Sequence, residues 1–243
     1  MTSSEDRAQA RRSKTESIRA ENQREDARRR NLRITLVVIA AFAVVAAAFV
    51  VIGKTVTGSG TAVAAGETRF VRADSHRLHT APDGRVTLVE FLDFECEACG
   101  AYFPLVEDLR KQYEGKVTFV ARYFPLPGHF NAERAARAVE AAAKQNRFEA
   151  MYRRMYETQR QWGEKQVPAD DTFRGLARDL GLDMAAWEKA YHDSATLERI
   201  KKDMADGQAV GVQGTPTFFL NGKKIEPRSE EEFKAALDAA LAR

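Results

Sequence analysis

The two cysteines of the chain, Cys96 and Cys99, are separated by only two residues, and this spacing constrains how the chain can fold. A disulfide between them closes a very small loop and removes little entropy from the unfolded chain. The fold must therefore be stabilised by a hydrophobic core, and 243 residues, 44% of them hydrophobic, are enough to build one. The cysteine pair then needs a chemical explanation, either redox exchange or metal binding.

The segment Ile34–Gly53 contains twenty residues without a charge. As a helix rising about 1.5 Å per residue, it is long enough to cross the roughly 30 Å hydrocarbon core of a membrane. Five arginines lie shortly before it and only Lys54 follows closely, which predicts that residues 1–33 stay in the cytoplasm and that the rest lies outside. A cleaved signal peptide is the alternative, because Ala62–Ala64 resembles a cleavage site, but the apolar run is longer than in most signals.

Small residues dominate the segment 54–66, which predicts a flexible linker before a domain at 67–243. Residues 1–33 carry ten Lys and Arg against six Asp and Glu, so 28 basic (38 minus 10) and 29 acidic (35 minus 6) residues remain for the rest of the chain. A nearly neutral domain lacks the basic patch that nucleic-acid binding requires. We therefore expect no nucleic-acid partner.

A strand, a helix and a second strand are predicted around the cysteines. Residues 86–92 form an apolar, β-branched run whose one charged member is Glu90, and residues 116–123 alternate as a strand does. The helical pattern between them begins at the cysteine pair. This order predicts a parallel pair of strands joined by a right-handed crossover.

Helical patterns fill residues 131–207, where Asn131 is predicted to cap a helix that continues through Met155. Strand character returns at 217–220, and the following Asn-Gly pair predicts a hairpin. Ser229 has the form of a capping box before a final amphipathic helix. The pattern predicts an α/β domain interrupted by an all-helical insertion.

The position of Cys96 at the start of a helix favours redox chemistry. The positive end of the helix dipole and unpaired N–H groups stabilise a thiolate there, while Cys99, one turn later, would release a mixed disulfide. Zinc binding by both cysteines with His76 and His79 is an alternative, but a strand followed by a helix suits redox exchange better.

Three sequence motifs resemble the DsbA-like thiol-disulfide oxidoreductases of the thioredoxin superfamily. They occur in the order of that family, as Val89–Cys99, Tyr123–Leu126 with His129, and Gly214–Phe218. The resemblance covers about residues 67–243. It implies a thioredoxin-like fold with an all-helical insertion at about 131–207, and no cofactor besides the redox-active disulfide.

The resemblance also implies roles for individual residues. Cys96 resembles the nucleophile and Cys99 the thiol that resolves the mixed disulfide. Pro216 matches the family's cis-proline, next to which substrate binds, and Thr215 then faces the sulfurs. Glu90 matches an acidic residue that moves the proton of the second cysteine, and a solvent-exposed carboxylate is the alternative. His129 fits the family pattern, with a plain loop contact to the insertion as its alternative.

One departure concerns the residues between the cysteines, which are Glu97 and Ala98 and not the Pro-His of strongly oxidising members. A carboxylate near the thiolate predicts a less oxidising potential. We still expect a membrane-anchored disulfide donor to exported cysteine-containing proteins, restored by a quinone-linked membrane partner. An extracytoplasmic reductase is the main alternative, and a zinc-binding module without activity is another.

Overall fold

The structure is a computed structural model that describes residues 68–243. The predicted cytoplasmic segment 1–33, membrane helix 34–53 and linker 54–66 lie outside the described residues. Among the helices from residue 68 onward, none has both the length and the apolar character to span a bilayer.

A five-stranded sheet forms the centre of the domain, in the spatial order β1-β3-β2-β4-β5. The strands are β1 (His76–His79), β2 (Thr87–Leu92), β3 (Thr118–Tyr123), β4 (Thr217–Leu220) and β5 (Lys223–Ile225). The predicted parallel pair is present as β2 and β3, and the other neighbours are antiparallel. The sequence did not predict β1, because its four residues include only one apolar side chain.

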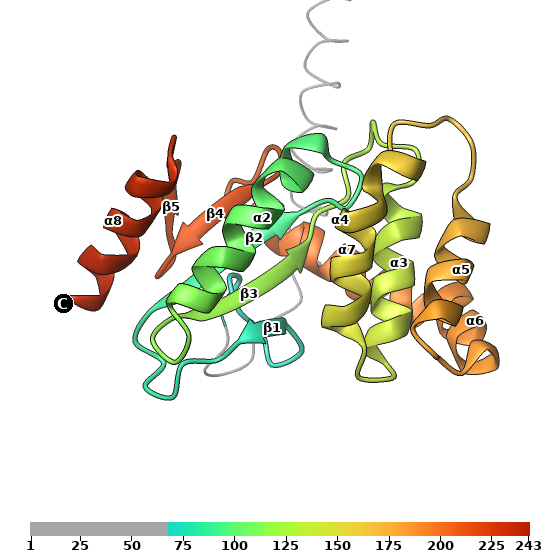
Figure 1. Cartoon of the computed structure of the whole chain (residues 1–243), viewed down its shortest axis with the longest axis horizontal. Helices are drawn as coiled ribbons and strands as arrows, with labels where there is room; N and C mark the ends of the chain where they lie inside the picture. The colour runs from blue at the N-terminus through green and yellow to red at the C-terminus, as the bar shows by residue number, and fades with distance from the viewer. Residues whose placement is uncertain (1–67) are drawn as a thin grey trace, which may run out of the picture. The chain divides into compact units, whose positions relative to one another are not determined.

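Helices cover the sheet, and those of the insertion stand together beside one end of it (Figure 1). The crossover helix is α2 (Glu97–Gln112), and the chain closes with α8 (Glu230–Leu241), whose Ser229 hydroxyl caps it as predicted. Between β3 and β4 lies the helical insertion of α3 (Ala132–Ala143), α4 (Phe148–Trp162), α5 (Asp170–Asp179), α6 (Met184–His192) and α7 (Ser194–Ala209).

The first part of the insertion differs from the prediction of one helix from Asn131 to Met155. The chain turns between α3 and α4, where Asn146 has a φ of 59°, a left-handed conformation that asparagine tolerates better than most residues. Asn131 precedes α3, but its side chain does not cap that helix. Its amide donates instead to the carbonyls of Lys165 and Val167, and its oxygen accepts from the Ala169 N–H.

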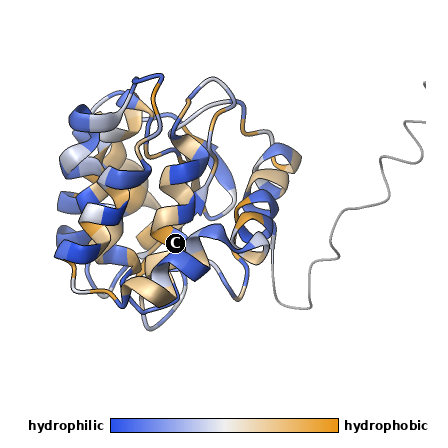
Figure 2. Ribbon diagram, turned by 90° about the vertical axis from the view of Figure 1, so that its right-hand side faces the viewer, coloured by the Kyte–Doolittle hydropathy of each residue, from blue (hydrophilic) through white to orange (hydrophobic). Residues whose placement is uncertain are grey.

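Hydrophobic side chains cover both faces of the sheet. Leu88, Leu92 and the aromatic residues Phe119 and Tyr123 belong to a large core shared with α2, α8 and the insertion, whereas Phe91 packs on the opposite face in a smaller cluster. Figure 2 shows hydrophobic and hydrophilic residues alternating along the helices, as amphipathic packing requires. The central strand β2 is therefore buried on both sides.

A buried ion-pair network attaches the insertion to the sheet. The Arg122 side chain of β3, which is 0% exposed, donates to Asp203 at 2.6 Å and to Asp206 at 2.7 Å, both on α7. Asp206 also pairs with Arg72 from the N-terminal part of the domain. Since breaking a buried pair leaves an uncompensated charge, this network fixes the position of α7.

Candidate active site

The cysteine pair lies at the carboxyl end of β2 and the start of α2. Cys96 is the N-cap residue of α2, and Cys99 lies in its first turn. Both thiols are free and buried, with Cys96 at 7% and Cys99 at 1% exposure. The structure thus places both cysteines where the sequence predicted, with the first one nearer the surface.

The two thiols differ in acidity. A hydrogen bond from Cys99, aided by Thr215 and by the first N–H groups of the helix, lowers the pKa of Cys96 to about 5 although burial opposes this. Burial raises the pKa of Cys99 well above its usual value, and its shared proton with Cys96 and the charge of Glu90 add to the effect. Cys96 is therefore a thiolate at neutral pH, and Cys99 keeps its proton.

Glu90 lies on β2 with only 6% of its surface exposed, so the alternative of a solvent-exposed carboxylate is wrong. Burial raises its pKa to about 8, and the negative charges of Glu107 and Cys96 contribute. A carboxyl with this pKa is mostly protonated at neutral pH and exchanges its proton readily. The charge of Glu90 acts on Cys99, and proton transfer between the two residues stays a prediction.

The segment before β4 faces the first cysteine. The Thr215–Pro216 peptide bond is cis, and the Thr215 carbonyl oxygen lies 3.3 Å from Cys96 Sγ, where it accepts a hydrogen bond while that thiol carries its proton. The Thr215 hydroxyl is buried and has no hydrogen-bond partner within residues 68–243. A groove of about 400 Å³ begins at Pro216 and continues past Tyr102 toward Arg228. Substrate binding at Thr215 and Pro216 remains a prediction.

Two acidic residues of the active-site loop were missed by the sequence analysis, although charges within an apolar run signal them. Asp93 is 1% exposed, its carboxylate accepts from the N–H groups of Glu95 and Leu126, and it contacts His129 Nδ1 at 2.6 Å. Glu95, equally buried, accepts from the N–H groups of Asn131 and Glu164. These contacts attach the loop to the start and the middle of the insertion.

Gln159 of α4 was also missed, and no local sequence pattern marks it. Its amide nitrogen donates to the carbonyls of Phe94 and Cys96, both at 2.8 Å. Gly100 makes this approach possible, because a Cβ there would lie 2.1 Å from the Gln159 amide oxygen. The backbone beside the reactive sulfur is thus held by a side chain of the helical insertion.

The histidines of the zinc alternative have other partners. His76 Nε2 lies 2.6 Å from a Glu140 oxygen and its ring stacks on Phe148, while His79 Nε2 accepts from the Gly115 N–H at 2.7 Å. Within residues 68–243, no three His, Cys, Asp or Glu side chains are grouped so that they would hold a metal ion. The structure gives the zinc alternative no support.

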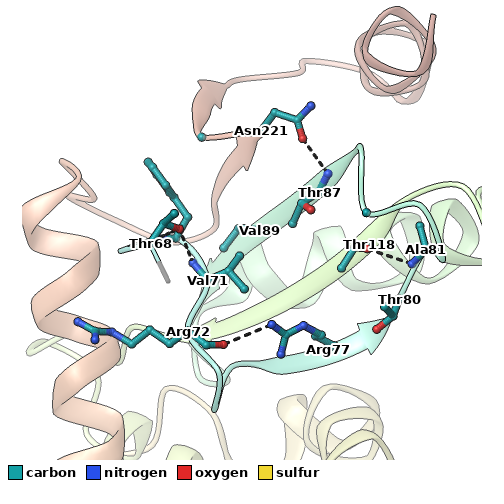
Figure 3. A pocket seen from close by; sticks show the side chains of 13 residues that line it. Thr68, Val71, Arg72, Arg77, Thr80, Ala81, Thr87, Val89, Thr118 and Asn221 are labelled. Carbon is teal, nitrogen blue, oxygen red and sulfur yellow. Dashed lines mark hydrogen bonds between the residues drawn. The ribbon is translucent and has the colours of Figure 1, made fainter. Parts of the chain in front are cut away.

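A larger hollow lies away from the sulfurs, on the side of the sheet where the Val89 side chain points (Figure 3). Its volume is about 700 Å³, and Val71, Arg77 and Asn221 are among its lining residues. None of the predicted site residues lines it. The hollow is therefore separate from the cysteine site.

A two-cysteine motif at the start of a helix, facing the segment that enters β4 of a central sheet, is the arrangement of a thioredoxin-like fold. A family model described as Thioredoxin matches residues 76–239, and the chain belongs to that family. A thioredoxin-like oxidoreductase from Silicibacter pomeroyi DSS-3 is 26% identical, with a TM-score of 0.61 over 72% of this chain and 96% of that one. The predicted α/β fold with a helical insertion is confirmed.

More distant solved structures share the fold. Oxidised BdbD from Bacillus subtilis is 22% identical with a TM-score of 0.61, covering 68% of this chain and 92% of that one. The α-DsbA1 of Wolbachia pipientis is 17% identical with a TM-score of 0.64, covering 71% and 94%. The predicted resemblance to DsbA-like proteins is thus supported at the level of the fold.

Curated relatives of similar sequence are longer proteins. The chain is 34% identical over 159 residues to the Na(+)/H(+) antiporter NhaA 1 of Mycobacterium sp. (strain KMS), covering 64% of this chain and 25% of the antiporter. It is 34% identical over 174 residues to NhaA 3 of Salinispora tropica, covering 71% and 26%. The chain spans about a quarter of the length of these relatives.

Proposed function

We propose that this protein is a thiol-disulfide oxidoreductase that donates the Cys96–Cys99 disulfide to exported cysteine-containing proteins. The observation that carries the proposal is the acidity of the two thiols, with the pKa of Cys96 lowered to about 5 and that of Cys99 raised well above its usual value. The position of Thr215 against Cys96 Sγ and the similarity to a thioredoxin-like oxidoreductase support the same chemistry.

In the proposed reaction, a substrate thiolate attacks Cys96 Sγ of the oxidised protein. The Cys96–Cys99 bond breaks, a mixed disulfide forms at Cys96, and Cys99 leaves as a thiolate that takes up a proton from Glu90 or from water. A second substrate thiolate then attacks the substrate sulfur, and Cys96 leaves as a thiolate. Two electrons have passed from substrate to protein, and the substrate holds a disulfide.

The acidity of Cys96 favours the donor over the reductase. A stabilised thiolate makes the reduced protein more stable, and this makes the oxidised protein a stronger oxidant. Glu97, exposed and next to Cys96, opposes this effect. A donor needs an oxidant to restore its disulfide, for which we propose a quinone-linked membrane partner, and we place the catalytic domain outside the cytoplasm behind the segment 34–53.

The experiment that tests the direction is an equilibrium titration of the Cys96–Cys99 couple against glutathione. A potential of about −120 to −180 mV, the range of known disulfide donors, is the expected result. A potential near −270 mV would instead identify a reductase. A Cys99→Ala variant should accumulate mixed disulfides through Cys96, and a protein that forms neither the bridge nor these adducts would refute both directions.

Membrane topology has its own test. In intact cells, a protease added outside should remove the domain that begins near residue 67 while a tag before residue 33 stays protected. Protection of the domain in intact cells, with cleavage only after lysis, would refute the proposed location.

A further inference from the structure

Asp93 connects both cysteines to a histidine of a separate loop. Its carbonyl accepts from the Cys96 N–H at 3.2 Å, and its own N–H donates to Cys99 Sγ at 3.5 Å. Its carboxylate is buried and lies 2.6 Å from His129 Nδ1. His129 is therefore separated from the sulfur-bearing backbone by a single residue, although it follows Cys96 by 33 positions in the chain.

The surroundings of this pair are rich in negative charge. Glu95 lies in the same loop, and a Glu164 oxygen lies 4.0 Å from His129 Nε2. In the part of the chain that the structure describes, no Lys or Arg nitrogen lies within 4.0 Å of the Asp93 carboxylate. The imidazole of His129 is thus the group that can place a positive charge against the Asp93 carboxylate, beside the loop that becomes negative when Cys96 is a thiolate.

Other charged groups near His129 are already paired with one another. A pocket of about 560 Å³ that His129 lines also contains Glu133, Arg134, Arg137, Asp170 and His192. Arg137 pairs with Glu133 at 2.9 Å, Arg134 with Asp170 at 3.3 Å, and His192 with Glu188 at 3.5 Å. His129 can therefore exchange protons with solvent through this pocket, and the carboxylate that pairs with His129 is that of Asp93.

We propose that Asp93 and His129 form a positioning pair of the disulfide-exchange site, in which Asp93 fixes the loop that holds both cysteines and protonated His129 offsets the negative charge of Asp93, which would otherwise destabilise the Cys96 thiolate. This inference rests on the proposed function. It identifies the source of positive charge in a motif that has Glu97 and Ala98 between its cysteines. His129 acts on Cys96 through its contact with Asp93 and through its electrostatic field, and it takes no covalent part in the reaction.

The acidity of His129 agrees with this arrangement. Burial lowers the pKa of an imidazole, but the hydrogen bond and charge of Asp93 raise the pKa of His129 overall, and the Cys96 thiolate and Glu164 add to the increase. Linkage is mutual: if the Cys96 thiolate favours the protonated form of His129, protonated His129 favours the thiolate of Cys96 by the same free energy.

The first measurement uses the unaltered full-length protein in detergent. The His129 ring protons are titrated by NMR with the cysteine pair oxidised and then reduced, and a His129→Asn variant assigns the signal. We expect a higher midpoint in the reduced protein, because only that state carries the thiolate. Equal midpoints in the two states would overturn the proposal, and a purely structural histidine would give that result.

The second measurement separates charge from hydrogen bonding. Asn at position 129 keeps an N–H near the place of Nδ1 and removes the charge, so the thiolate absorbance of Cys96 should titrate about one pH unit higher. The glutathione equilibrium should shift about tenfold toward the oxidised protein, a change of about 30 mV toward more negative potential. The matched control, His192→Asn, removes another histidine of the same pocket and should change neither value.

The outcomes distinguish the two proposals. If the unaltered protein exchanges disulfides and His129→Asn leaves the Cys96 titration and the potential unchanged, the positioning pair is refuted and the proposed function stands. If the unaltered protein itself forms no Cys96–Cys99 bridge, the proposed function fails first.

Discussion

Replacing Gly100 with alanine tests how strongly the helical insertion holds the active-site loop. The new Cβ would lie 2.1 Å from the Gln159 amide oxygen, so the Gln159 side chain must move. Because this side chain is flexible, it moves without disturbing the core, but it then releases the carbonyls of Phe94 and Cys96. The substitution therefore removes two buried hydrogen bonds and nothing larger.

The magnitude follows from these two bonds. Each contributes about 0.5–1.5 kcal/mol, so their loss costs about 1–3 kcal/mol. Alanine in place of glycine within a helix stabilises the folded protein by about 1 kcal/mol. Gly175 of α5 is the matched control, because a Cβ there meets no atom within 4 Å and only the helix gain applies. The two variants should thus differ by about 1–3 kcal/mol in free energy of unfolding, with Gly100→Ala the less stable.

Urea denaturation of the reduced protein measures this difference. A Gln159→Ala background provides the decisive comparison, since the obstacle is then absent and Gly100→Ala should stabilise the protein by about 1 kcal/mol. Equal stability of Gly100→Ala and Gly175→Ala in the unaltered background would refute the reasoning. A Gly100→Ala substitution that stays destabilising without Gln159 would refute it as well.

Two further substitutions test buried groups. Because burial raises the pKa of Glu90 from 4.5 to about 8, the folded protein keeps a proton that the unfolded chain has lost, and stability falls as pH rises through this window. Glutamine carries no titrating proton, so Glu90→Gln should remove that loss. The free energy of unfolding of the variant, relative to that of the unaltered protein, should rise by up to about 1.4 kcal/mol for each pH unit in this window. A difference between the two proteins that stays constant with pH would contradict this. Gly207→Ala on α7 places a Cβ 2.8 Å from Phe124 and 3.0 Å from Phe91, which are fixed in the core, and should cost about 1–3 kcal/mol. A melting temperature equal to that of Gly175→Ala would show that the rings move freely.

Periodic patterns in the sequence predicted most of the sheet and its crossover. Long apolar runs such as β2 leave a clear signal because both faces of the strand are buried. The edge strand β1 leaves none, because only one of its four residues is apolar and its histidines find their partners in distant parts of the chain. The break between α3 and α4 was also not predicted, because it depends on a left-handed asparagine within an otherwise continuous helical pattern.

The active site was predictable only where the chemistry is local. Cys96 and Cys99 share one helix start, so their spacing predicts their roles. The contacts that hold them come from other parts of the chain, as with Gln159, which approaches Cys96 from 63 positions away. No pattern within a short window describes such a contact. His129 was noted in the sequence, but its link to the sulfurs becomes visible only through Asp93 in the folded domain.

Hydrogen bonds attach the active-site loop to the helical insertion, so a change in the insertion should reach the cysteines. Gln159 and the partners of Glu95 belong to the helical part, while the sulfurs belong to the sheet part. A substitution that displaces Gln159, or the backbone at Asn131 and Glu164, removes hydrogen bonds from the loop that carries Cys96. The backbone around Cys96 therefore depends on the folding of the insertion, and loosened helices should release the active-site loop while the sheet is still folded.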